Sequence, residues 1–185
     1  VRMLPRSLLV ILILGLVARL MYVVWYPQQP VAHDAEGYDK TAVALVSTGH
    51  YPAFGRAPVY PMFLAGVYWV FGHSYPHVRV VQAVLVSLTA LFGFLLGRDL
   101  FGHREGLIAG GIASVYPGFF AYSGLLLTET LFALLVTAFT WCVVQMWRGG
   151  GLRWAAASGI TLGLATLCRG EIVGVAVPVT ALLAW

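Results

Sequence analysis

The chain has 185 residues, of which 60% are hydrophobic and only 10% are charged, and its mean hydropathy is +0.86. This composition excludes an ordinary soluble domain and is typical of an all-α polytopic membrane protein, because lipid offers no partners to exposed backbone groups. At roughly 20 residues per crossing, the chain has room for about five or six transmembrane helices. The net charge of +4 comes mainly from arginines in short loops, so nucleic acid is not an expected partner.

The first apolar block covers residues 8–26 and follows two arginines. Its length, its embedded Arg19 and the lack of a small-residue cleavage site predict a retained crossing rather than a secretion signal. We expect Arg19 to pair with an acid or to extend its charged end toward the membrane surface.

A polar and aromatic stretch at about 27–78 follows and is predicted to form a long first outer loop. One helical face of residues 36–48 is apolar, which predicts a short helix lying on the membrane surface. Residues 58–71 are more apolar, but as a helix they would rise only ~21 Å, less than the ~30 Å hydrocarbon core. We therefore expect a second surface-lying helix that does not cross. Four aromatic side chains of this loop fit an interfacial aromatic belt: Tyr60, Tyr68, Trp69 and Tyr75.

Further apolar blocks cover residues 80–96, 107–122 and 125–147. The last region, 154–185, is too long for one untilted crossing, and its polar group Arg169, Gly170 and Glu171 predicts two segments that meet there. With 58–71 not crossing, most arginines share one side, which the positive-inside rule makes cytoplasmic: Arg2, Arg6, Arg98, Arg104, Arg148 and Arg153. The long loop then faces outward, and residues 1–185 form a single membrane-embedded module.

Acidic residues concentrate in the outer loop. Three of the seven acids of the chain lie within residues 33–40, namely Asp34, Glu36 and Asp39. Such a concentration of acidic residues in so apolar a chain suggests that this stretch has a chemical role. Each of these acids also has a structural explanation, as a solvated charge or, for Asp34, as a helix cap.

The order of several short motifs resembles the N-terminal half of the GT-C glycosyltransferases, in the branch of protein O-mannosyltransferases and lipid A aminoarabinose transferases. The motifs are Asp34 and Tyr38 in an Asp-x-x-x-Tyr arrangement, Ala42 and Gly49, the run at 56–61 with Arg56 and Tyr60, Arg79 and Gln82, and the Leu-Thr-Glu-Thr-Leu-Phe run at 127–132 around Glu129. Two features depart from this pattern. Ala35 separates Asp34 from Glu36 where family members often have adjacent acids, and members are usually much longer, so we expect a fragment or a small member.

The resemblance implies an inverting transfer of a sugar from a polyprenyl-phosphate carrier to an acceptor hydroxyl, on the outer face of a cytoplasmic membrane that we expect to be bacterial. It implies Asp34 as the catalytic base and Glu129 as a second catalytic acid that orients the acceptor or a metal. The alternative for Glu129 is a carboxylate favoured by the positive end of a helix. The acceptor stays unidentified.

Arg56 and Arg169 are the candidates for binding the carrier phosphate, because guanidinium groups form paired hydrogen bonds to phosphate. Their alternatives are an interfacial position for Arg56 and an ion pair with Glu171 or Glu129 for Arg169. Glu36, Tyr38 and Tyr60 are candidates for an assisting role. No cofactor is certain; a divalent cation beside Asp34 and His33 stays open, although one histidine with carboxylates is weak evidence for it.

Two other functions stay open at this stage. A protein of the same shape could bind or flip the lipid carrier without transferring the sugar, or serve as a non-catalytic membrane subunit. An inverted repeat, or a pair of interrupted helices in matching halves of the chain, would favour transport, and neither is evident in the sequence.

Overall fold

The computed structural model describes residues 5–25, 34–52, 56–172 and 174. In this part of the chain all regular secondary structure is helical, and there is no strand. The elements, in chain order, are α1 (Arg6–Trp25), α2 (Asp34–Thr48), α3 (Val59–Phe71), α4 (Tyr75–Leu100), α5 (His103–Val115), α6 (Pro117–Gly124), α7 (Glu129–Trp147), α8 (Leu152–Cys168) and the 3-10 turn Gly170–Ile172. The predicted all-α class is confirmed.

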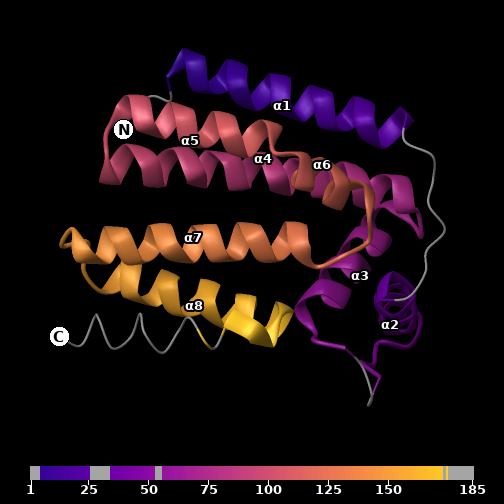
Figure 1. Cartoon of the computed structure of the whole chain (residues 1–185). Helices are drawn as coiled ribbons and strands as arrows, with labels where there is room; N and C mark the ends of the chain where they lie inside the picture. The colour runs from indigo at the N-terminus through magenta and orange to yellow at the C-terminus, as the bar shows by residue number, and fades with distance from the viewer. Residues whose placement is uncertain (1–4, 26–33, 53–55, 173, 175–185) are drawn as a thin grey trace.

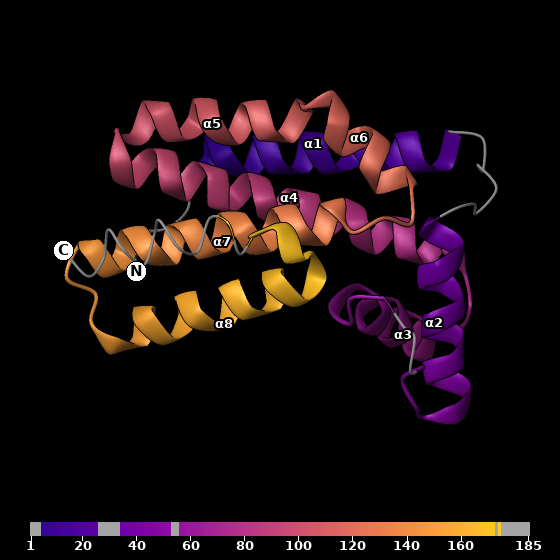
Figure 2. The same cartoon turned by 60° about the horizontal axis from the view of Figure 1, so that its bottom comes forward.

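The long helices run side by side and form a bundle (Figure 1). α4 is its central member, since it packs against α1, α5 and α7, while α7 also packs against α8. Among the described residues, α1, α4 and α7 are long and apolar enough to cross a membrane. α8 is a shorter apolar helix, and it lies beside α7 along the bundle (Figure 2).

The predicted block at 107–122 is divided into α5 and α6. Proline at position 117 has no backbone N–H and disfavours helical backbone at the residue before it. Tyr116 accordingly adopts an extended conformation between the two helices. The predicted break in the last region lies where expected, because α8 ends at Cys168 and Arg169 is extended. The segment that would follow falls mostly outside the described residues.

Arg19 connects α1 to α4 and to the end of α5 through hydrogen bonds. Its side chain is fully buried and donates hydrogen bonds to the backbone oxygen of Ser114 at 2.7 Å and to Oγ of Ser87 at 2.8 Å. The carbonyl of Ser114 is one of the last of α5 and has no next turn to donate to it, because the helix stops at Val115. The expectation of an acidic partner or of an exposed charge is therefore wrong: Arg19 caps a broken helix from the neighbouring one.

Replacing Arg19 by methionine should lower the free energy of unfolding by ~1–3 kcal/mol, because the Ser114 carbonyl is left buried without a donor. Thermal unfolding of the purified protein in detergent measures the change. Arg6→Met, at the exposed start of the same helix, is the matched control and should unfold as the wild type does. An Arg19→Met protein as stable as this control would contradict the capping role.

α2 and α3 lie together at one end of the bundle, turned away from its long axis (Figures 1 and 2). α2 confirms that a short helix forms here, and α3 has only 13 residues, too few for a crossing at 1.5 Å per residue. Both pack on a buried apolar cluster to which α2, α3, α4, the α6–α7 connection and the end of α8 contribute: Ala42, Tyr60, Leu64, Ala65, Val67, Tyr68, Val78, Leu126 and Cys168. This cluster brings segments far apart in the sequence to the same end of the bundle.

Gln82 connects this cluster to the entry of α7. Its side chain accepts a hydrogen bond from the hydroxyl of Tyr60 at 2.8 Å and donates to the backbone oxygen of Leu125 at 2.7 Å. Tyr60 and Tyr68 are buried, so their placement in an aromatic belt is wrong, whereas Trp69 is largely exposed. The buried hydroxyls have polar partners inside the protein, which is what a tyrosine requires when it leaves the surface.

Candidate functional site

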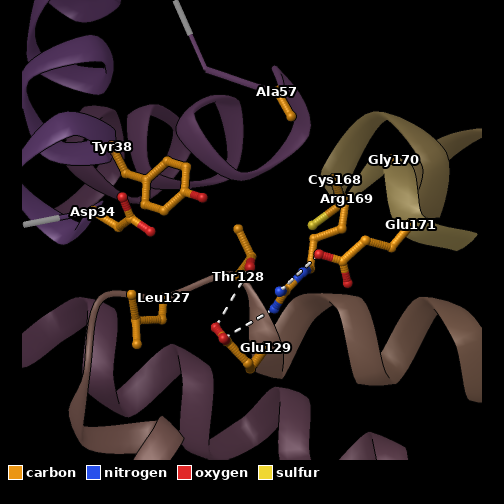
Figure 3. A pocket seen from close by; sticks show the side chains of 10 residues that line it. All are labelled: Asp34, Tyr38, Ala57, Leu127, Thr128, Glu129, Cys168, Arg169, Gly170 and Glu171. Carbon is orange, nitrogen blue, oxygen red and sulfur yellow. Dashed lines mark hydrogen bonds and ion pairs between the residues drawn. The ribbon is translucent and has the colours of Figure 1, made fainter.

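A cavity of about 300 Å³ opens where α2, the start of α7 and the end of α8 meet (Figure 3). Asp34 and Tyr38 contribute from the first turns of α2, and the α6–α7 connection and α8 contribute the opposite walls. Its lining consists of Asp34, Tyr38, Ala57, Leu127, Thr128, Glu129, Cys168, Arg169, Gly170 and Glu171. The cavity therefore brings together three of the residues for which the sequence predicted a site role with charge: Asp34, Glu129 and Arg169.

Glu129 and Arg169 form the floor of this cavity (Figure 3). Nη1 of Arg169 lies 3.0 Å from Oε1 of Glu129, and its Nη2 lies 3.3 Å from Oε1 of Glu171. Glu129 is the first residue of α7, where the helix dipole favours a negative charge. Arg169 is directly after α8 in extended conformation, and its guanidinium lies over the ring of Phe132.

The charge of Arg169 is secure in this setting. Partial burial lowers the pKa of its guanidinium, but the Glu129 and Glu171 carboxylates more than offset that effect and leave the pKa above its ordinary value. An arginine that stays charged while it is only partly exposed is suited to bind an anion that enters the cavity.

Asp34 occupies the other wall and is paired with Arg56. Nη1 of Arg56 lies 2.7 Å from Oδ1 of Asp34, and the guanidinium lies over the ring of Tyr38 at 4.9 Å from its centroid. This hydrogen bond to Asp34 raises the pKa of Arg56 above its ordinary value. The side chain of Asp34 is 63% exposed and that of Arg56 is 39% exposed, so the pair is accessible to solvent and to ligands.

Gly37 provides the space in which Arg56 lies. A Cβ atom at this position would be 2.4 Å from Nε of Arg56, whereas a Cβ atom at Gly66 in α3 would meet nothing within 4 Å. Arg56 reaches Asp34 across the first turn of α2 only because that turn lacks a side chain at position 37.

Gly37→Ala and Gly66→Ala form a matched pair for this contact. Each adds a residue that favours the helix by ~1 kcal/mol in a helix interior. Gly66→Ala should raise the unfolding temperature, and Gly37→Ala should not, because its methyl group displaces the Arg56 guanidinium. Thermal unfolding of the two variants checks this, and an equal rise in both would show that the position of Arg56 against Gly37 does not contribute to stability.

Of the remaining predicted site residues, Tyr38 belongs to the cavity lining and the others do not. Glu36 is not part of the cavity lining and forms an ion pair with Lys40 at 2.6 Å. Tyr60 is fully buried beneath the site, with its hydroxyl bonded to Gln82. His33 lies outside the described residues, and within them no group of three or more histidines, cysteines and acids is placed to hold a metal ion.

Several lining residues were not predicted to belong to the site, namely Ala57, Leu127, Thr128, Cys168 and Gly170. The hydroxyl of Thr128 lies 3.4 Å from Oε2 of Glu129, so it borders the acid directly. Most of these residues are direct sequence neighbours of a predicted site residue, and this position in the sequence could have indicated that they line the site.

Comparison with known families gives one result that covers most of the chain. The family described as dolichyl-phosphate-mannose-protein mannosyltransferase matches residues 55–185. This region contains Arg56, Glu129 and Arg169, and it begins after α2, which carries Asp34. No curated protein and no solved structure gives a significant match. The resemblance inferred from the sequence motifs is confirmed, and the chain belongs to the dolichyl-phosphate-mannose-protein mannosyltransferase family, whose members are membrane glycosyltransferases of the GT-C type.

Proposed function

We propose that the protein transfers a sugar from a polyprenyl-phosphate carrier to an acceptor hydroxyl, with inversion at the anomeric carbon, on the outer face of a cytoplasmic membrane. The observation that supports this most is the cavity itself, in which the carboxylate of Asp34 faces the Glu129 and Arg169 pair from a different part of the chain. A transfer of this kind needs a base for the hydroxyl and cations for the leaving phosphate, and both lie at this cavity.

In the proposed reaction, Asp34 takes the proton of the acceptor hydroxyl as that oxygen attacks the anomeric carbon. The bond between this carbon and the phosphate oxygen breaks, and its electron pair leaves with the carrier phosphate. A single displacement inverts the configuration at the carbon. Asp34 lines the cavity of about 300 Å³ and its side chain is 63% exposed, so it is accessible to an acceptor.

The ion pairs of the resting site fit this redistribution of charge. The carrier phosphate of the donor is a diester with one negative charge, and a second charge develops on it as the bond breaks. Asp34 loses its negative charge at the same time, because it accepts the proton. Arg56, which is paired with Asp34 in the structure, is then released to the phosphate. An exposed pair of this kind is worth only ~0.2–1 kcal/mol, so the exchange of partners costs little.

Arg169 supplies the second cation for the phosphate, because a guanidinium has five N–H groups and can bind an oxygen while it keeps a carboxylate partner. Glu129 and Glu171 hold it in place. Glu129 also borders the cavity beside Thr128, where it can orient the acceptor. In this proposal the two guanidinium groups of Arg56 and Arg169 supply positive charge to the phosphate.

Charge placement supports the outward orientation. Four arginines lie at helix ends opposite α2 and α3 along the bundle (Figure 1), namely Arg98, Arg104, Arg148 and Arg153. By the positive-inside rule this end is cytoplasmic. The cavity lies at the other end, beside α2 and α3, and so on the outer side, where lipid-linked sugars of this class would be presented to acceptors.

The test is release of free polyprenyl phosphate when the purified protein in detergent is given a panel of polyprenyl-phosphate sugars and an acceptor peptide or lipid mixture. We expect release with at least one donor. A carrier-binding or flipping protein, the main alternative, would bind the same lipids but would release no free polyprenyl phosphate from any of the donors.

A further inference from the structure

The third acid of α2, Asp39, does not line the cavity, and its environment differs from those of Asp34 and Glu36. The side chain of Asp39 is only 13% exposed, whereas that of Glu36 on the same helix is 52% exposed. A carboxylate withdrawn from water in this way needs hydrogen-bond donors. The groups that donate hydrogen bonds to Asp39 therefore indicate its role.

Three side chains supply those donors. Oδ1 of Asp39 accepts a hydrogen bond from the hydroxyl of Tyr68 at 2.6 Å and lies 2.9 Å from Nε2 of His73. Oδ2 accepts a hydrogen bond from the hydroxyl of Tyr75 at 3.1 Å. The three rings also pack edge to face, Tyr68 on His73 at 4.7 Å and His73 on Tyr75 at 5.2 Å between centroids. Both carboxylate oxygens are thus held by an aromatic cluster.

The donors come from three successive parts of the chain. Tyr68 lies in the last turn of α3, His73 lies in the connection after it, and Tyr75 is the first residue of α4. α4 is the central helix of the bundle. A single side chain of α2 is therefore bound to the turn at which α3 passes into α4.

Asp34 and Asp39 are carried by the same helix, five residues or ~7.5 Å apart along its axis. Asp34 begins this helix, and the Arg56 pair that holds its side chain is largely exposed to solvent. The orientation of the exposed end of α2 must therefore be set farther along the helix, where its buried contacts lie. Asp39, Thr41 and Ala42 are its buried residues, and Asp39 alone among them carries charge.

We propose that Asp39 is a positioning residue: its bonds to Tyr68, His73 and Tyr75 hold α2 so that Asp34 faces the cavity. This inference rests on the proposed function, in which Asp34 is the base. Asp39 touches neither the cavity nor a reacting atom; it acts through the helix that it shares with Asp34.

The kinetic test uses Asp39→Asn together with Tyr68→Phe. Loss of the carboxylate charge or of its closest donor should lower kcat by ~10- to 100-fold, since misplacement of a reacting group by about 1 Å can cost that much. The KM for the lipid donor should change less than ~2-fold, because the arginines that bind phosphate lie on other segments. The loss in the double variant should be smaller than the two single effects multiplied together, since both substitutions weaken the bond between Asp39 and Tyr68.

Matched controls separate this effect from general damage. Lys40→Gln removes the exposed charge next to Asp39, and Tyr116→Phe removes an exposed hydroxyl at the α5–α6 break. Both should keep the wild-type kcat. Should Asp39→Asn fail to fold, Tyr75→Phe, which loses only the longest of the three bonds, gives the same readout in a milder form. A kcat unchanged in Tyr68→Phe and Tyr75→Phe would overturn the proposal.

A second measurement does not depend on transfer. Nitroxide labels at Lys40→Cys on α2 and Leu152→Cys on α8, both exposed positions, report the distance between the two helices by pulsed electron resonance. The distribution should broaden or shift when Asp39→Asn is added, and an unchanged distribution overturns the positioning role. If the wild type releases no polyprenyl phosphate but the distribution still broadens, the proposed function fails and the attachment of α2 by Asp39 stands.

Discussion

Asp34→Asn is expected to reduce the rate of polyprenyl phosphate release by ~10²- to 10⁴-fold, the usual contribution of a positioned general base. Asparagine keeps the size of the side chain and an oxygen that can accept the bond from Arg56, but it cannot take up a proton. Single-turnover release of free polyprenyl phosphate from a bound lipid-linked sugar measures the chemical step without product dissociation.

Binding of the carrier should survive this substitution. Arg56 and Arg169 stay in place, and removal of the competing charge of Asp34 leaves Arg56 more available to phosphate. We therefore expect the Kd for the donor to be unchanged or lower, measured by titration of a fluorescent donor analogue. Normal release by Asp34→Asn would end the assignment of Asp34 as the base, and a flipping or scaffold function would then account better for the cavity.

The polar end of the molecule was predictable from sequence because its signals are local. Acids and arginines are scarce in an apolar chain, so each one near a predicted helix end marks a place where water or a polar ligand is expected. Asp34, Glu129 and Arg169 stand at the start of α2, the start of α7 and the end of α8. The shortness of α3 and the break after Cys168 follow in the same way from run length and interrupting polar residues.

Partner identity was not predictable, because it depends on packing between distant segments. Arg19 has a helix carbonyl as its partner rather than an acid, and this could be known only once α5 was seen to stop beside α1. Tyr68 is of a residue type that is common at membrane interfaces, but its hydroxyl is bound to Asp39 inside the protein. A tyrosine suits either setting, since it needs only one polar contact for its hydroxyl, and a single sequence does not say which one it has.

Replacing Arg169 by glutamine is expected to weaken binding of polyprenyl phosphate by ~10- to 100-fold, since charge-assisted hydrogen bonds contribute ~1.5–3 kcal/mol. The affinity of Arg169→Lys for polyprenyl phosphate should lie between those of the wild type and Arg169→Gln. An ammonium group keeps the charge, but it cannot bind Glu129, Glu171 and phosphate through a planar set of donors. Titration with the free carrier phosphate measures the change. Arg153→Gln, at the cytoplasmic end of the proposed arrangement, is the control and should bind as the wild type does.

Glu129→Gln separates a phosphate-binding Arg169 from a purely structural ion pair, since it removes the same pair from the other side. A structural pair predicts that Arg169→Gln and Glu129→Gln lower the unfolding temperature alike and leave phosphate binding unchanged. A phosphate-binding arginine predicts that the Kd rises in Arg169→Gln and does not rise in Glu129→Gln, because in the latter a competing carboxylate is removed while Glu171 still holds the guanidinium. Changes of the same sign in both variants would contradict the role proposed for Arg169.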